Sequence, residues 1–120
     1  MIWLDNTSMA DSVLEPAIFE EMRELMGDTL SEFILTYLDN SPKLISKIES
    51  GLSENNPDSI YHGAHQLKGG SGSIGALKLA AVSFEIEKIS KGGSTDGVSP
   101  LLEQLKSEYI LLEIELKKSL

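Results

Sequence analysis

Apolar residues recur at intervals of three and four positions along most of this sequence. Between residues 30 and 52, for example, Leu30, Ile34, Tyr37 and Leu44 follow this spacing. It places apolar side chains on one face of an α-helix, whereas a half-buried strand needs strict alternation of apolar and polar residues. No such alternation is present in the sequence. The pattern therefore predicts an all-α fold.

The first half of the chain predicts a short helix followed by a long one. The short helix covers about residues 14–26, where Leu25 is among the residues expected to face inward, and Gly27 ends it. Either of the next two residues, an aspartate and a threonine, can cap the long helix, which carries apolar residues as far as position 52. We expect Pro42 to kink this long helix, because proline removes one backbone hydrogen bond.

The second half of the chain predicts three more helices. Pro57 follows a capping asparagine and starts a helix at about 57–72, and the next helix lies at about 76–91. Pro100 follows Ser99, so the same cap-and-proline signal starts the last helix. Long amphipathic helices joined by short turns predict an antiparallel, up-and-down four-helix bundle. The short additional N-terminal helix is expected to act as a lid.

Length and charge limit the kinds of protein that this chain can be. Its 120 residues fit one domain, which we place at residues 11–120 behind a flexible N-terminal lead-in at residues 1–10. The net charge of −9 argues against nucleic-acid binding, which needs a basic surface. No apolar run is long enough for a membrane helix, so we expect a soluble, cytoplasmic protein. The absence of cysteine excludes thiol catalysis and disulfides.

The segment 64–76 is rich in glycine and carries a histidine and a lysine one helical turn apart. On a helical projection His65 faces away from the apolar stripe, and Gly69 and Gly72 are its neighbours on the same face. Glycine inside a helix costs roughly 1 kcal/mol relative to alanine, so these glycines need a compensating role. Their missing side chains would let the surface of another protein approach the imidazole closely.

Two further glycines, Gly63 and Gly70, lie on a flank of the same predicted helix, where a neighbouring helix can pack closely.

The pattern around the histidine resembles the histidine phosphotransfer (HPt) domain family of two-component phosphorelays. The residues that carry this resemblance are His65, Leu67, Lys68, Gly69, Ser71, Gly75, Ala76, Leu79 and Glu87. Gly70 and Gly72 depart from the family, which more often has serine or alanine there.

The resemblance implies a role for each of these polar side chains. His65 would accept a phosphoryl group on Nε2, and Lys68 would stabilise the charge of that group. Glu87 is the candidate that accepts a hydrogen bond from Nδ1 and orients the ring, although many relatives have glutamine at this position. Independently of the resemblance, we expect His62, together with Gly69 and Gly72, to border the surface that binds the partner.

The resemblance also implies the partners. The phosphoryl group would come from the aspartate of a receiver domain and pass to the aspartate of another, so the partners are response-regulator receiver domains, a hybrid histidine kinase, or both. Mg²⁺ is expected on the receiver-domain partner, and no cofactor on this chain. The sequence lacks a Gly-rich nucleotide-binding loop, so we expect a phosphocarrier and not an ATP-dependent enzyme. We also expect this phosphocarrier to be a monomer.

Other interpretations of the same residues remain open at this stage. His65 can be an ordinary surface histidine, and Lys68 a solvated lysine, in a helical bundle that binds a partner without being phosphorylated. His62 and His65 can suggest a metal site, but a closed site needs more ligands than two histidines. A hydrolytic enzyme using these two histidines would need a nucleophile and an orienting acid, and neither is evident.

Overall fold

The computed structural model describes residues 13–120, and every regular element among them is helical. The expected lead-in at residues 1–10 lies outside the described residues. The elements are α2 (Pro16–Met26), a 3₁₀ turn (Gly27–Thr29), α3 (Leu30–Ser53), α4 (Pro57–Ile74), α5 (Leu77–Lys91) and α6 (Val98–Lys117). The all-α prediction is therefore confirmed.

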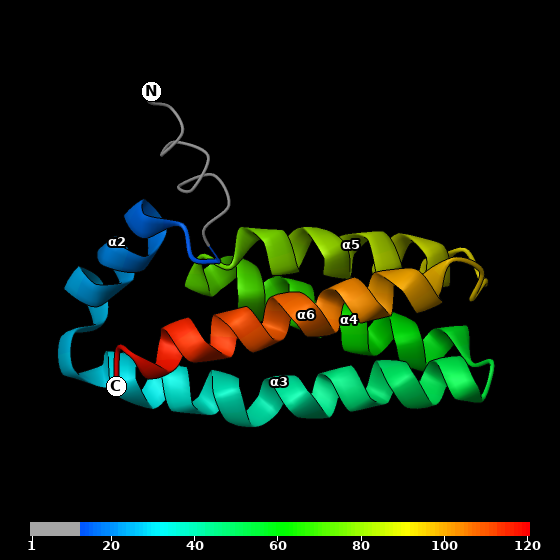
Figure 1. Cartoon of the computed structure of the whole chain (residues 1–120), viewed down its shortest axis with the longest axis horizontal. Helices are drawn as coiled ribbons and strands as arrows, with labels where there is room; N and C mark the ends of the chain where they lie inside the picture. Colours follow the sequence, from blue (N-terminus) through cyan, green and yellow to red (C-terminus); the bar gives the residue numbers. More distant parts are fainter. Residues whose placement is uncertain (1–12) are drawn as a thin grey trace.

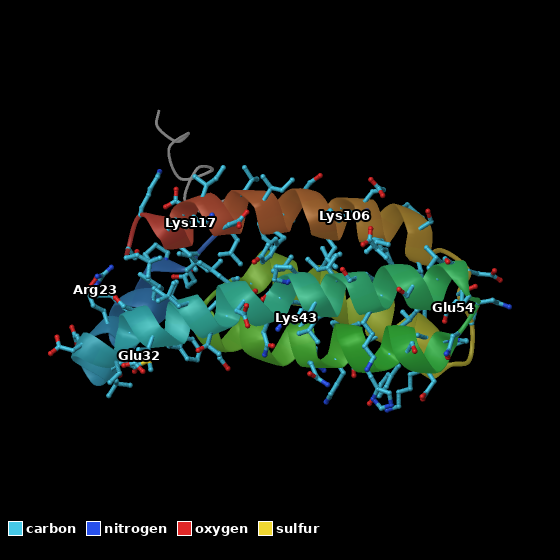
Figure 2. All side chains as sticks on the ribbon, turned by 90° about the horizontal axis from the view of Figure 1, so that it is seen from below. Arg23, Glu32, Lys43, Glu54, Lys106 and Lys117 are labelled. Atoms are coloured by element: carbon cyan, nitrogen blue, oxygen red, sulfur yellow. The ribbon has the colours of Figure 1, made fainter. Side chains whose placement is uncertain are left out.

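The four long helices form a closed ring. α4 packs against α3 and α5, and α6 completes the ring by packing against α5 and α3. Figure 1 shows them running side by side in alternating directions, with α2 at the end where α4 turns into α5. The predicted antiparallel bundle with a short additional N-terminal helix is confirmed. Charged side chains such as Lys43, Lys106 and Lys117 lie on the outside of the bundle (Figure 2).

Helix α4 is held in a fixed rotation about its own axis. The side chains of one stripe lie in the core with almost no exposed surface, as the helical projection predicts: Ile60, Ala64, Leu67, Ser71 and Ile74. The hydroxyls of Tyr37 on α3 and Ser71 on α4 are 2.6 Å apart and share a buried hydrogen bond. Since one face of α4 is fixed against the core, the opposite face is fixed toward solvent.

The ends of α4 follow the predicted signals. The Asn56 side chain caps the first turn by accepting a hydrogen bond from the Ser59 backbone N–H at 3.3 Å. Gly75 ends the helix in the left-handed conformation with φ 90°, and the Ala76 N–H donates to the Ser71 carbonyl oxygen at 2.8 Å. The helix therefore extends to Ile74, two residues beyond the predicted end at 72.

The side chains of Thr29 and Ser99 form no capping hydrogen bond at the starts of α3 and α6. Thr29 precedes α3, but its hydroxyl donates to the Met26 carbonyl oxygen at 2.8 Å and caps no N–H of α3. Ser99 does not cap α6, because the helix already starts at Val98 after Gly97, whose φ of 87° makes the turn. Val98 is fully buried, so its packing in the core moves the start of the helix ahead of the local cap signal.

Helices α2 and α3 can each be compared in detail with the sequence prediction. Leu25 does not face inward, since it is 80% exposed, and Phe19 is the residue of α2 that is buried. The helix contacts α3 and α4 at the end of the bundle, and these tertiary contacts decide which of its apolar side chains is buried. Helix α3 continues through Pro42 from Leu30 to Ser53, and the kink expected at Pro42 stays a prediction.

The flank glycines of α4 differ in how closely they pack. A Cβ added at Gly63 would lie 2.9 Å from Cγ1 of Ile48 and 3.0 Å from the Leu44 carbonyl oxygen, so only glycine fits there. A Cβ at Gly70 would meet the Tyr37 ring at 3.5 Å, which is an ordinary contact. The prediction of close helix packing on this flank is thus confirmed most strongly at Gly63. Within residues 13–120, no helix is long and apolar enough to cross a membrane.

Candidate functional site

His65 lies near the middle of α4 and faces away from the core stripe. Its side chain is 53% exposed, as the helical projection predicts. Its Nδ1 is 3.0 Å from Oε2 of Glu87 on the neighbouring helix α5. Among the described residues, the other ring nitrogen, Nε2, has no hydrogen-bond partner. One nitrogen of the imidazole is therefore held by the protein, and the other is free.

Glu87 joins the two cationic candidates of α4. Its side chain is only 8% exposed, and its second oxygen, Oε1, is 2.8 Å from Nζ of Lys68. One carboxylate thus contacts His65 through one oxygen and Lys68 through the other. Burial alone raises the pKa of Glu87, but the ion pair with Lys68 and the hydrogen bond with His65 outweigh it, so the pKa lies below its ordinary value of 4.5.

The ionised carboxylate decides the tautomer of the neutral imidazole. Since an ionised carboxylate can only accept hydrogen bonds, Nδ1 of His65 must carry the proton that it donates to Glu87. In the neutral ring Nε2 then has a lone pair and no proton. The side chain therefore presents a nucleophilic nitrogen toward solvent.

The ion pairs of Glu87 predict how stability depends on pH. Because the pKa of Glu87 is lower in the folded chain than in the unfolded chain, its contribution to stability is full above the ordinary carboxyl pKa and is lost as the pH falls through the folded value. We expect the parent protein to be more stable than Glu87→Gln at pH 7, by on the order of 1 kcal/mol, and this difference to shrink in acid.

Urea unfolding of both proteins at pH 7, 5 and 3.5 measures this difference. Glu85→Gln is the matched control, since Glu85 lies on the same helix with a 54% exposed side chain that pairs with Lys88. Its effect should be small at every pH, because exposed ion pairs contribute little. A Glu87→Gln difference that stays constant from pH 7 to pH 3.5 would contradict the prediction.

Lys68 has contacts that the sequence interpretation missed. Its side chain is 33% exposed, and its Nζ is bound to Glu87 and lies 5.1 Å from the centre of the Phe84 ring. Lys88 lies 4.9 Å from the same ring. Cations at this distance are attracted to the face of an aromatic ring. The Phe84 side chain is 43% exposed. A phenylalanine one turn before Glu87 is the sequence signal that could have indicated this contact between Lys68 and an aromatic ring.

The surface on the C-terminal side of His65 is open. A Cβ added at Gly69 or at Gly72 would meet no heavy atom of the described residues within 4 Å. Packing among these residues therefore does not require glycine at either position, in contrast to Gly63. These two residues leave free space next to the exposed imidazole.

His62 lies outside the group formed by His65, Lys68 and Glu87. Its Nε2 is 3.5 Å from Oδ1 of Asp58, one turn earlier on α4, and both side chains are exposed. The described part of the chain has no cluster of three or more histidine, cysteine, aspartate or glutamate residues that could hold a metal ion. Tyr61, which the sequence interpretation did not single out, contacts both histidine rings.

The sequence and the fold of this chain are both similar to those of known proteins. The model of the Hpt domain matches residues 32–115, which include α4, α5 and most of α3 and α6. The chain belongs to the Hpt domain family. Histidine-containing phosphotransfer protein 4 of Arabidopsis thaliana is 30% identical over 105 residues, which cover 82% of this chain and 83% of that protein.

In some relatives the matching region is only a small part of a longer protein, and in others it is nearly the whole chain. The aerobic respiration control sensor protein ArcB of Escherichia coli is 24% identical over 106 residues, and the match spans 88% of this chain but only 14% of the sensor. Among solved structures, histidine-containing phosphotransfer protein B from Pseudomonas aeruginosa PAO1 has a TM-score of 0.87 at 25% identity, covering 91% of this chain and 95% of that one. ZmHP2 from maize shares the fold, with a TM-score of 0.80.

Proposed function

We propose that this Hpt domain is a phosphorelay intermediate that accepts a phosphoryl group on His65 from a receiver-domain aspartate and passes it to another receiver aspartate. The observation that carries the proposal is the imidazole itself: Nδ1 donates to the ionised Glu87, and Nε2 is free on an exposed face beside Gly69. The names of the relatives, which describe histidine-containing phosphotransfer, support it.

The chemical step needs no proton transfer. The lone pair of His65 Nε2 attacks phosphorus, the N–P bond forms, and the bond from phosphorus to the aspartate oxygen breaks, so that the aspartate leaves as a carboxylate. The ring then carries a positive charge and keeps its proton on Nδ1. The carboxylate of Glu87, 3.0 Å from Nδ1, stabilises this charge as it develops. Transfer to a second aspartate reverses the same step.

Lys68 supplies the positive charge for the phosphoryl oxygens. Phosphoryl transfer spreads charge over these oxygens, so catalysis depends on positioning and on nearby cations. Lys68 lies one turn from His65, and its Nζ is bound to the same carboxylate as the ring. In this proposal the ammonium turns from Glu87 toward the phosphoryl group, or contacts both, when the group arrives on Nε2. Mg²⁺ on the receiver-domain partner would supply the remaining charge.

Replacing Lys68 by alanine is expected to slow transfer by roughly tenfold to a thousandfold while the helical fold remains, because a preorganised cation next to the transferring group is lost. The rate is measured as label transfer from a phosphorylated receiver domain, and the fold by circular dichroism. Lys43→Ala is the control, since Lys43 lies on α3 with a 71% exposed side chain and, among residues 13–120, pairs only with Asp39. Equal rates for Lys68→Ala and the parent would exclude this role of Lys68.

The proposal also covers the partners and the source of the phosphoryl group. The partners are response-regulator receiver domains, with or without a hybrid histidine kinase. The protein is a cytoplasmic monomer that carries the phosphoryl group and does not take it from ATP itself. The test is incubation with a panel of labelled phospho-receivers in the presence of Mg²⁺. Label that moves to this chain, is lost in acid and survives in alkali indicates phosphohistidine. A chain that takes no label from any of them would instead be a helical interaction module.

A further inference from the structure

Tyr61 covers one face of the His65 ring. The two residues lie four positions apart on α4, which places them one above the other on the same side of the helix. Their rings are nearly parallel, with an angle of 14° between the planes and 5.5 Å between the centres. This is the offset stacked arrangement that aromatic pairs prefer. It follows from the tilt of helical side chains toward the N-terminus, which brings His65 back over the preceding turn.

The surroundings of the His65 ring differ on its two sides along the helix. Tyr61, four residues before it, presents an aromatic ring, whereas Gly69, four residues after it, presents no side chain. The ring is therefore supported from the N-terminal side and open on the C-terminal side. Glu87 holds its Nδ1 edge from α5. Together these contacts restrict both rotation of the ring and its tilt, and they leave the Nε2 edge free.

Tyr61 is itself held in place by its neighbours. Its ring meets the ring of His62 edge to face, with 5.3 Å between the centres and 70° between the planes. It also lines a hollow between the start of α4 and the end of α5, together with residues such as Pro57, Ser90 and Lys91. Tyr61 is partly buried in this position, so it can act as a firm support for a side chain that is itself half exposed.

We propose that Tyr61 is a positioning residue for phosphoryl transfer: its ring fixes the plane of the His65 imidazole, so that Nε2 points at the incoming phosphoryl group. This proposal rests on the proposed phosphorelay function. A half-exposed histidine held only by one hydrogen bond would populate other rotamers, and each of them would move Nε2 away from the direction of attack. From the usual strength of an aromatic stack, the loss of Tyr61 should slow transfer about twofold to tenfold.

The test compares Tyr61→Leu with Tyr61→Phe, which removes the hydroxyl but keeps the ring. Two quantities are measured: the NMR chemical shifts of the His65 ring protons in the unphosphorylated protein, and the initial rate of label transfer from a phospho-receiver. We expect Tyr61→Leu to remove the ring-current shift of the His65 protons and to slow transfer. Tyr61→Phe should keep both the shift and the parent rate. Circular dichroism checks that both variants are folded.

The outcomes separate this proposal from the proposed function. If the parent protein takes label but Tyr61→Leu takes it at the same rate, or if Tyr61→Phe is as slow as Tyr61→Leu, the positioning role of the ring is wrong and the phosphorelay function stands. Unchanged His65 shifts in folded Tyr61→Leu also overturn it, because the stack is then absent in solution. If the parent protein takes no label, the proposed function itself fails.

Discussion

His65→Gln is expected to abolish phosphoryl labelling of this protein completely. Glutamine keeps a polar side chain of similar reach, but its amide nitrogen has no available lone pair, so no N–P bond can form. The fold should not change, because the His65 side chain is 53% exposed and contributes no atom to the core. The measurement is label transfer from a phosphorylated receiver domain to the parent and to the variant at equal concentration.

The chain contains its own control for this experiment, since it has two histidines. His62 lies on the same helix with a 51% exposed side chain, but its Nε2 faces Asp58 and no residue of α5 orients its ring. His62→Gln should therefore retain labelling. If His65→Gln still took label while His62→Gln did not, the phosphoacceptor would be His62 and not His65. The roles proposed for Glu87 and Lys68 would then lose their basis.

Gly69→Arg is expected to prevent transfer without unfolding the protein. The receiver must bring a recessed aspartyl phosphate to His65, and an arginine four residues away on the same face would occupy the space through which it approaches. A Cβ at Gly69 would meet no atom of residues 13–120 within 4 Å, and glycine is the poorer helix former by roughly 1 kcal/mol. The melting temperature should therefore stay the same or rise while label transfer collapses.

Gly63→Ala is the contrasting variant on the same helix. Its new Cβ would lie 2.9 Å from the Ile48 side chain and 3.0 Å from a backbone oxygen, so α3 and α4 would have to separate. We expect it to lower stability by about 1–3 kcal/mol, the usual cost of overpacking. Normal transfer to Gly69→Arg, or loss of transfer only through unfolding, would overturn the access argument, and Gly69 would then need a packing explanation instead.

The role of Glu87 illustrates a limit of interpretation from sequence. Helical spacing indicates which way His65 points, because residues on one helix are related by a local repeat. Glu87 lies 22 positions later on another helix, and no local repeat relates the two residues. Its candidacy came only from the resemblance to the HPt family. Whether the carboxylate reaches Nδ1 depends on how α4 and α5 are rotated and aligned against each other.

Local signals and tertiary packing thus determined different features of this protein. The sequence by itself determined the all-α class, most helix ends, the buried stripe of α4 and the exposed position of His65, because these depend on residues within a few turns of one another. Only the tertiary structure decided that one Glu87 carboxylate binds both Lys68 and His65. Packing also buried Phe19 instead of Leu25 and started α6 at Val98. These contacts join separate helices, and their energies depend on the packing of the whole bundle, which no short stretch of sequence contains.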